Sequence, residues 1–404
     1  MQKPWICFQL GAREHYAIPR SLHQSQQLHS LYTDTWVTPR SPLRKVPLRL
    51  LKPLHDRYHP DLSDATVHHA TSQSILFELQ QKAKKFQNWD LILRRNQWFQ
   101  KQALCYLKGL KFEKLNTPPV LFSYSYAALD LLRYAKSQGW QTILGQIDPG
   151  ILESQIVQEE RDRHPELAPN YQSPPKIYWE QWYEECQLVD YILVNSSWSS
   201  QLLQQAGIQA TKIHTVPLVY TPPPDAQTFT REYPEKFSDD RPLRVLFLGQ
   251  VILRKGVAAV IEAAKLLSDR PVEFWIVGSL GIHPPDLANI RWFGSVPRSQ
   301  VADYYQTADI FLFPTLSDGF GLTQLEAQAW KLPIITSQNC GQVIEHGTNG
   351  LILSEISGAT IYEAICSILT LPSLLKRFSS CHSDIFHTCS LNNFGKILSR
   401  FSNF

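Results

Sequence analysis

An apolar strand, a turn with two glycines and the start of a helix follow one another in the second half of the chain, flanked by two carboxylates. The strand is Ile310–Phe313, Asp318 stands in the turn, and Glu326 follows eight residues later inside the helix. Unpaired backbone N–H groups and the dipole at a helix N-terminus bind anionic oxygens. Carboxylates accept hydrogen bonds from hydroxyl groups. Recognition of phosphate and of a polyol side by side predicts a nucleotide sugar as the ligand.

Two adjacent cations stand in a second loop of the same kind. Gly249 closes a short apolar strand, Arg254 and Lys255 follow, and a helix begins after Gly256. Arginine offers a planar fork of donors and lysine a compact charge, so the pair at a helix start suits a diphosphate. Two basic residues alone are better explained by a solvated loop. Their position between a strand and a helix is what favours a diphosphate clamp.

Both loops resemble signatures of one protein family. The segment from Asp318 to Glu326 resembles the carboxylate signature of the retaining family 4 glycosyltransferases, within glycosyl transferases group 1. That signature reads E-G-F-G-x-x-x-x-E-A, and here the first acid is an aspartate. The loop from Gly249 is similar to the family's G-R-x-x-x-x-K-G, with Lys255 at the lysine and Gln250 where arginine is common. Further similar segments follow in order, at 190–217, 308–310, 333–335 and 345–351.

The resemblance implies a fold and a division of roles. The implied fold is GT-B, an α/β fold with two Rossmann-like, doubly wound parallel-sheet domains facing a cleft. Glu326 is expected to bind the nucleotide ribose and Asp318 the transferred sugar, while Arg254 supplies the guanidinium missing at Gln250. The other expected donor contacts are Lys255 and the backbone of Gly249, Gly278, Gly319, Phe320 and Gly321. The implied reaction retains the configuration at the anomeric carbon, and the leaving phosphate assists the incoming hydroxyl.

The first half departs from the family where an active-site histidine is usual. The strand there ends in Asp148, Pro149 and Gly150, so Asp148 either faces the cleft on a sugar hydroxyl or only forms the turn. In the first loop, Arg13 and His15 are candidates beside the acceptor. Three glutamates are expected to form a solvated acidic face: Glu153, Glu159 and Glu160.

The sequence lacks the motifs of several other kinds of enzyme. No G-x-G-x-x-G follows Leu10 or Gly249, which disfavours a nicotinamide dehydrogenase. The chain has no Asp-x-Asp triplet of the metal-dependent transferases, so Arg254, Lys255 and a helix end are expected to meet the diphosphate charge without a metal or cofactor. Two rivals stay open. One is another GT-B activity, such as sugar-phosphate synthesis or epimerisation, and the other is a degenerate transferase that binds nucleotide or glycan without turnover.

The elements that must position these residues alternate as strand and helix. This alternation predicts parallel sheets whose ligands bind beyond the carboxyl ends of the strands. In the second half the expected elements are 244–249, 257–267, 272–277, 290–296, 297–306, 310–313, 322–331 and 333–336. In the first half they are 5–10, 120–124, 129–136, 142–147, 191–194 and 198–206. The expected organisation is an acceptor-side domain (1–220), a proline-rich linker (221–241), a nucleotide-sugar domain (242–380) and a C-terminal helix that returns toward the first domain (381–404).

Composition sets the broad class. With 404 residues, of which 43% are hydrophobic and 19% charged, the chain is long enough for two globular domains. A formal net charge of +3 is too small to indicate nucleic acid as a partner. No run approaches the length of a membrane-spanning helix, and the apolar start is too short for a signal peptide. Seven scattered cysteines indicate reduced thiols, and together these features predict a cytoplasmic protein.

Two basic stretches suggest a peripheral contact with a membrane. Residues 40–57 are basic but interrupted by prolines, and residues 75–107 have helical composition. The second stretch combines cations with aromatic residues, namely Lys82, Lys84, Lys85, Arg94, Arg95, Lys101, Trp89, Trp98 and Phe99. Such a surface either rests on anionic lipid at the inner membrane face or is a solvated surface over an ordinary core. The acceptor hydroxyl could accordingly belong to a lipid, a polysaccharide precursor or a small metabolite.

Overall fold

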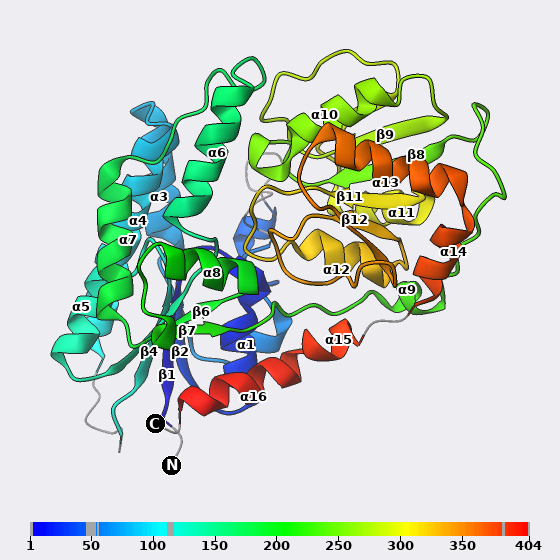
Figure 1. Ribbon diagram of the computed structural model, residues 1–404. Coiled ribbons are helices and arrows are strands. Elements are labelled where there is room, and N and C mark those ends of the chain that lie inside the picture. Colours follow the sequence, from blue (N-terminus) through cyan, green and yellow to red (C-terminus); the bar gives the residue numbers. More distant parts are fainter. Residues whose placement is uncertain (1–2, 46–53, 55, 111–116, 382–383, 403–404) are drawn as a thin grey trace.

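The computed structural model describes residues 3–45, 54, 56–110, 117–381 and 384–402. Within these residues the chain forms two α/β units, each built on one sheet of parallel strands (Figure 1). The described strands of the first sheet number seven, in the order β3-β2-β1-β4-β5-β6-β7, and those of the second number six, in the order β10-β9-β8-β11-β12-β13. In each sheet the strand order reverses beside the first strand, β1 or β8. This switch point is where sheets of this type bind their ligands.

The strands agree with most of the sequence pattern. The first sheet consists of β1 (Trp5–Gln9), β2 (Leu28–Thr33), β3 (Val67–His69), β4 (Val120–Tyr124), β5 (Gln141–Gly145), β6 (Tyr191–Val194) and β7 (Ile213–Thr215). The second consists of β8 (Leu243–Leu248), β9 (Val272–Val277), β10 (Ile290–Gly294), β11 (Ile310–Phe313), β12 (Ile334–Thr336) and β13 (Gly350–Ile352). The pattern does not predict β2, β3, β7 and β13. These strands are very short or rich in polar residues, so no apolar run marks them.

Helices cover both faces of each sheet. The first unit contains α1 (Ala17–Gln24), α3 (Thr71–Ala83), α4 (Asn88–Gly109), α5 (Leu129–Ser137), α6 (Ile151–Arg163), α7 (Lys176–Leu188) and α8 (Ser197–Gln205). Beyond it lie α9 (Pro224–Thr228), α10 (Val257–Leu266), α11 (Val301–Thr307), α12 (Leu322–Ala329), α13 (Gly358–Thr370), α14 (Ser373–Ser380), α15 (Ile385–Thr388) and α16 (Leu391–Phe401). The helical stretch expected at 75–107 is two helices, α3 and α4. The chain turns between them, where Lys85 and Asn88 have positive φ angles of 58° and 53°.

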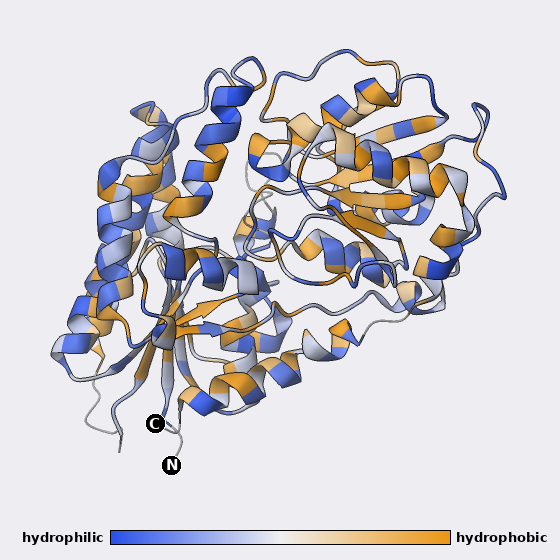
Figure 2. Ribbon diagram, in the orientation of Figure 1, coloured by the Kyte–Doolittle hydropathy of each residue, from blue (hydrophilic) through white to orange (hydrophobic). Residues whose placement is uncertain are grey.

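Alternate residues of each strand enter different halves of the core. In β1, Ile6 and Phe8 pack with residues of α4, α5 and α7, whereas Trp5 and Cys7 pack with residues of α1 and α16. This alternation is the two-residue period of a strand, and here both of its faces are buried. In β8, Val245 packs with α10 and α13 on one face of the second sheet, while the next residue packs with α12 on the other. Figure 2 shows the result, with apolar strands between helices whose outer surfaces are hydrophilic.

The end of the chain packs on the first unit rather than the second. Helix α16 runs along that unit below α1 (Figure 1). The hydrogen bonds that secure it include those from Trp5 Nε1 to Ser402 Oγ at 2.8 Å and from Gln141 Nε2 to the carbonyl of Phe401 at 3.0 Å. The chain therefore crosses twice between the two units, once through residues 216–242 and once before α16.

The two units also touch through the segment that follows α6. Leu167 and Ala168 are buried in the core of the second unit. The carbonyl of Leu167 accepts a hydrogen bond from the backbone N–H of His283 at 2.9 Å. Helix α6 thus extends from the first unit against the loop before α10, beside the expected ligand site.

Among the described residues, no single helix is long and apolar enough to cross a membrane. By length and composition only, Gly358–Thr370 and Ser373–Phe401, which meet at a bend of 99°, would together be long and apolar enough to cross one. Buried residues of the first of these helices, including Ile361 and Ile365, pack in the core of the second unit. The seven cysteines of the sequence are all free thiols.

Candidate functional site

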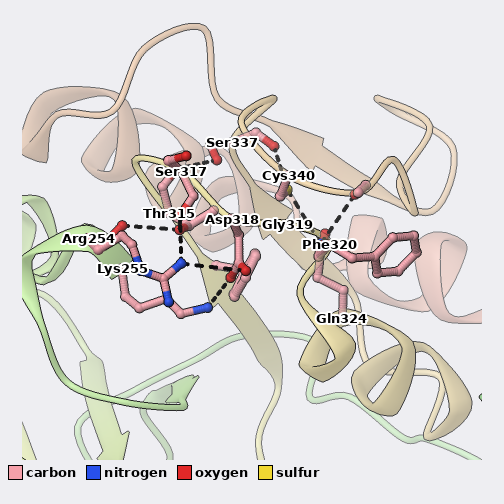
Figure 3. A network of polar contacts seen from close by, with 12 residues as sticks. Arg254, Lys255, Thr315, Ser317, Asp318, Gly319, Phe320, Gln324, Ser337 and Cys340 are labelled. Atoms are coloured by element: carbon pink, nitrogen blue, oxygen red, sulfur yellow. Dashed lines mark hydrogen bonds and ion pairs between the residues drawn. The ribbon is translucent and has the colours of Figure 1, made fainter. Parts of the chain in front are cut away.

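Arg254, Lys255 and Asp318, which the sequence predicted as donor-site residues, meet at the ends of β8 and β11 in the second sheet (Figure 3). Arg254 and Lys255 lie in a short 3-10 helix, Leu253–Lys255, after β8, and Asp318 lies in the loop after β11. Lys255 Nζ donates a hydrogen bond to Asp318 Oδ2, and Arg254 Nη1 lies 3.5 Å from Asp318 Oδ1. Arg254 Nη1 also donates to the carbonyl of Ser317 at 2.9 Å. All three charged side chains are less than a quarter exposed.

Close backbone packing holds the two loops together. Gly256 has a φ of +72°, and a Cβ placed on it would stand 1.9 Å from the carbonyl oxygen of Pro314. The carbonyl of Arg254 accepts hydrogen bonds from the N–H of Leu316 at 2.9 Å and from Thr315 Oγ1 at 3.1 Å. Only glycine fits at position 256, because it has no side chain and tolerates a positive φ.

The charges of this cluster stabilise one another. Burial favours the neutral form of Asp318, but attraction by Lys255 and Arg254 outweighs it, so the pKa of Asp318 lies below its ordinary value. Burial also opposes the charge of Arg254, yet Glu153 and Asp318 raise the pKa of its guanidinium. Asp318 and Arg254 are therefore charged at neutral pH, and Arg254 lies beside Lys255 where a diphosphate is expected.

The glycine turn after Asp318 leads into α12 with little space for side chains. Gly321 has a φ of +91° and precedes α12, and a Cβ on it would stand 2.6 Å from the ring of Phe313. Phe320 is buried, and its carbonyl accepts hydrogen bonds from the N–H of Gly341 at 2.9 Å and from Gln324 Nε2 at 3.1 Å. The sequence expectation that the backbone N–H groups of Phe320 and Gly321 face a ligand stays a prediction.

Glu326 occupies a different environment from Asp318. Its Oε2 accepts a hydrogen bond from the hydroxyl of Tyr305, on α11, at 2.8 Å. Burial raises the pKa of Glu326, against the lowering effects of this hydrogen bond and of the charge of Arg298. The two carboxylates of the signature thus have separate charged neighbours, the pair after β8 for Asp318 and Arg298 for Glu326.

The glycines at the ends of β8 and β9 allow a direct backbone contact. A Cβ on Gly278 would stand 1.6 Å from the carbonyl oxygen of Gly249, and both residues have φ angles near 150°, at 147° and 149° respectively. A side chain at position 278 would therefore collide with the backbone of Gly249, whereas nothing lies within 4 Å of the Cβ position of Gly249 itself. Gln250, the residue where the family often has arginine, is exposed beside this contact.

The first unit contributes Asp148 at the end of β5. Its Oδ1 accepts hydrogen bonds from Gln146 Nε2 and from the N–H of Gly150, both at 2.9 Å, and from the hydroxyl of Tyr126. Asp148 therefore does form the turn, and its charge also acts on Arg254 across the domain interface. The two units come close here. A Cβ on Gly319, in the second unit, would stand 2.4 Å from the carbonyl oxygen of Ile147, in the first.

The expectation that Glu153, Glu159 and Glu160 form one solvated face is wrong. Glu159 is exposed, at 69% of its side chain, but Glu153 and Glu160 are only 13% and 8% exposed. Glu160 is paired with Arg163 at 3.3 Å, and Glu153 Oε1 lies 3.8 Å from Arg254 Nε in the other unit. Residues 153 and 160 are seven apart, so they share a face of α6, and buried Val157 lies between them on that face. This helical spacing was the signal in the sequence that distinguishes them from Glu159.

The first loop also reaches the second unit. His15 Nε2 lies 3.2 Å from Arg298 Nη1, and burial together with the charge of Arg298 lowers the pKa of His15. Glu14, His15 and Tyr16 have successive positive φ angles of 50°, 49° and 60°. Arg13 is exposed, with its guanidinium 6.0 Å from the centre of the Tyr124 ring. Of the two candidates in this loop, His15 is the one that contacts a residue near Glu326.

A polar pocket of about 420 Å³ opens between α8 of the first unit and the loop after β12 of the second. It is lined by Ser197, Trp198 and Gln201 of α8 and by residues 336–344 of the second unit. Trp198 Nε1 donates to Ser317 Oγ at 3.0 Å, which links this pocket to the cluster. Among the described residues, no group of three or more His, Cys, Asp or Glu side chains is arranged to hold a metal ion.

Comparison with solved structures identifies the fold. The chain is similar to sucrose-phosphate synthase from Thermosynechococcus elongatus, with a TM-score of 0.63 and 14% identity over 98% of each chain. It is also similar to HepE from Anabaena, solved in complex with UDP, with a TM-score of 0.57 and 12% identity over 98% of each chain. At these identities the likeness concerns the fold, which is GT-B, as the sequence resemblance implied.

The family model matches residues of the second unit. Residues 242–370 match the model of the family described as Glycosyl transferases group 1. Relatives include the amylovoran biosynthesis glycosyltransferase AmsK of Erwinia amylovora, 29% identical over 30% of this chain and 36% of that protein. Another is the D-inositol 3-phosphate glycosyltransferase of Paenarthrobacter aurescens, 27% identical over 38% of this chain and 42% of that protein. The matched regions thus span about two fifths of these relatives. Residues 242–370 are thus similar to the glycosyl transferases group 1, and they are carried on a chain with the GT-B fold.

Proposed function

We propose that this protein transfers a sugar from a nucleoside diphosphate sugar to an acceptor hydroxyl, with retention at the anomeric carbon. The observation that carries the proposal is the meeting of Arg254, Lys255 and Asp318 between the ends of β8 and β11. The family of the second unit supports it, as does the UDP held by the structural neighbour HepE. The acceptor is a lipid, a polysaccharide precursor or a small metabolite.

In the proposed complex the donor lies across the ends of the second sheet. Arg254 and Lys255 bind the diphosphate, and the backbone of Gly249, Gly278 and Gly319 contributes further contacts to the donor. Charge stabilisation by the two cations replaces the divalent metal that other transferases use. Because these cations are already fixed by Ser317 and Asp318, they need little reorganisation when the leaving group gains charge.

The two signature carboxylates divide the rest of the donor between them. Glu326, with Tyr305 and Arg298 as neighbours, binds the ribose hydroxyls, and Asp318 binds a hydroxyl of the transferred sugar. Asp148 faces the same sugar from the first unit. The bond from the anomeric carbon to the diphosphate oxygen breaks, the acceptor oxygen bonds to that carbon on the same side, and the acceptor proton passes to the leaving phosphate.

A second candidate is a degenerate member of the fold that binds a nucleotide or glycan without turnover. Three observations favour it: the absence of a histidine before Asp148, the exposed Gln250 at the usual arginine position, and the occupation of both cations by Asp318. Release of free nucleoside diphosphate from a donor sugar separates the two candidates. A transferase releases it faster when an acceptor is present, and a binding protein releases none.

Substitution of the two carboxylates is expected to separate binding from turnover. Glu326→Gln should weaken the binding of donor and of free nucleotide alike, because its proposed partner is the ribose. Asp318→Asn should not weaken nucleotide binding, since Asp318 competes with the phosphate for Lys255, but it should lower turnover. Calorimetry and product release measure the two effects. Equal losses of nucleotide affinity in both variants would contradict the division of roles.

We also propose that the protein is cytoplasmic and touches anionic membranes through the end of α3. Leu76 and Leu79 are 56% and 60% exposed there, and three lysines at the same end are exposed: Lys82, Lys84 and Lys85. We call these five residues the α3 patch. Other residues of the basic stretch are engaged within the protein: Arg95 is paired with Glu78, Arg94 packs on Phe86, Trp89 donates to the carbonyl of Gln172, and Trp98 stacks on Phe77. Lys101, on α4, is exposed. In the other basic stretch, 40–57, residues 46–53 and 55 lie outside the described residues.

The wild-type protein is expected to sediment with vesicles that contain anionic lipid, at low salt. Each basic residue near anionic headgroups contributes roughly 1 kcal/mol, and salt screens this attraction. Replacing the three lysines of the α3 patch by glutamine should release the protein without changing nucleotide affinity. The matched control replaces three exposed lysines of the second unit, Lys236, Lys265 and Lys376. If both triple variants sediment alike, the patch is a solvated surface.

A further inference from the structure

Glu153 lies within the proposed donor site, although nothing in the proposed reaction uses it. It stands in the first turn of α6, in the first unit, and its side chain is 13% exposed. Its Oε1 lies 3.8 Å from Nε of Arg254, the guanidinium that also binds Ser317. Its Oε2 is buried and has no hydrogen-bond partner of ordinary geometry among the described residues, although the side chain of Ser317 lies near enough to lower the pKa of the carboxyl. A buried, unpartnered carboxyl oxygen is costly, so its presence beside a ligand site needs a reason.

Negative charge already dominates the surroundings of Glu153. Asp148, from the turn before α6, and Asp318, from the loop after β11, both act on it, and Arg254 is the cation that opposes them. Lys255 lies beyond Asp318 and is paired with it. These three carboxylates thus share two cations before a donor binds. A diphosphate held by the same two cations adds further negative charge, which an ionised Glu153 would repel.

We propose that Glu153 contacts the donor diphosphate as an uncharged carboxylic acid that donates a hydrogen bond to a phosphoryl oxygen. A protonated carboxyl has an O–H donor, which an ionised one lacks. A phosphoryl oxygen that accepts from Arg254 comes within reach of a carboxyl 3.8 Å from that guanidinium. The unpartnered Oε2 is then the atom that carries the proton. This inference rests on the proposed function, because it requires a diphosphate on Arg254.

The environment of Glu153 is consistent with an uncharged acid. Burial raises the pKa of Glu153 to about 8, with a further rise from the two aspartates and against the lowering effects of Arg254 and of the Ser317 side chain. The residue is therefore mostly protonated at neutral pH before the donor binds. A bound phosphate raises this pKa further. Donor affinity should then be constant below pH 8 and fall above it, by up to about tenfold per pH unit, until the pKa of the complex is reached.

Calorimetry with whichever of UDP, GDP and ADP binds most tightly tests the proposal between pH 7.5 and 9. The terminal phosphate of a nucleotide ionises near pH 6, below this range. Glu153→Gln keeps a neutral hydrogen-bond donor at every pH, and Glu153→Ala removes it. Glu159→Gln is the matched control, since Glu159 lies on the exposed face of the same helix. Measurement in two buffers of different ionisation enthalpy reports the proton taken up on binding.

The expected results differ among the four proteins. Wild type and Glu159→Gln should lose about tenfold in affinity from pH 7.5 to 9 and take up a proton at the upper end. Glu153→Gln should match wild type at pH 7.5, lose no affinity at pH 9 and take up no proton. Glu153→Ala should bind about tenfold more weakly than wild type already at pH 7.5, the scale of a hydrogen bond to a charged group.

Two outcomes would overturn the proposal for Glu153 and leave the proposed function standing. One is wild-type affinity of Glu153→Ala at pH 7.5, and the other is an unchanged pH dependence in Glu153→Gln. A purely structural role for Glu153 predicts this second result, because a clasp between the two units takes up no proton on binding. A wild-type protein that binds none of the three nucleotides at any pH overturns the proposed function as well.

Discussion

Lys255→Ala and Arg254→Ala should each weaken the binding of a nucleoside diphosphate by about 1.5–3 kcal/mol, or roughly 10- to 150-fold. Each variant loses a charged hydrogen-bond donor to phosphate. Gln250 is exposed beside the strand end and carries no charge, so it cannot replace either cation. The loss should be similar for free nucleotide and for donor sugar, because both contain the diphosphate. Isothermal calorimetry with UDP, GDP and ADP measures it.

The control for this prediction separates the clamp from general charge. Lys265→Ala removes an exposed lysine from α10, the helix that follows the clamp, and should leave affinity unchanged. Lys255→Ala also leaves Asp318 with Arg254 as its cation, at 3.5 Å, so melting curves without ligand must show that the variant is folded. Wild-type affinity in both clamp variants would remove this loop from the donor site.

Gly256→Ala is expected to destabilise the second unit by about 2–5 kcal/mol. The left-handed conformation of Gly256, with φ at +72°, costs an alanine roughly 1–2 kcal/mol. The new Cβ would also stand 1.9 Å from the carbonyl oxygen of Pro314, and such overpacking costs about 1–3 kcal/mol. The loops after β8 and β11 would have to separate. Nucleotide affinity should fall with stability, because these loops carry Arg254 and Asp318.

Gly294→Ala is the matched control for the clash at Gly256. Gly294 has nearly the same φ, +67°, but nothing lies within 4 Å of its Cβ position. Gly294→Ala should therefore lose only the stability that the left-handed conformation costs an alanine, about 1–2 kcal/mol. Urea unfolding followed by tryptophan fluorescence compares the two variants. Equal shifts of the midpoint would mean that the loops adjust to the added methyl group and that their close packing is not required.

Much of the architecture could be predicted from local pattern. Apolar runs such as Ile310–Phe313, followed by glycine and an amphipathic helix, predict parallel sheets because a strand buried on both faces needs an apolar run. Short or polar strands such as β3, Val67–His69, carry no such signal, since pairing with β2 rather than their own composition makes them strands. The break between α3 and α4 was likewise not predicted. It depends on two residues with positive φ, which leave no mark in the helical periodicity.

The meeting of Arg254, Lys255 and Asp318 could also be predicted, although they are more than sixty residues apart. The carboxyl ends of parallel strands lie at one edge of a sheet, and the reversal of strand order places β8 beside β11. Two motifs that each end a strand are therefore brought together by topology alone. The family resemblance assigned their roles, and these roles stay predictions until the variants are measured.

The sequence by itself determined the two parallel sheets and the meeting of Arg254, Lys255 and Asp318 at the carboxyl ends of the second, where the donor site is proposed, because each depends on local patterns and on sheet topology. Only the tertiary structure decided the place of Glu153. Its seven-residue spacing from Glu160 places it on the face of α6 that carries buried Val157, but its charged neighbours there, Arg254 and Asp318, come from the other unit. How two domains face each other depends on surfaces assembled from distant segments. No local pattern encodes that arrangement, so a residue whose environment spans the interface can be recognised only once both domains are in place.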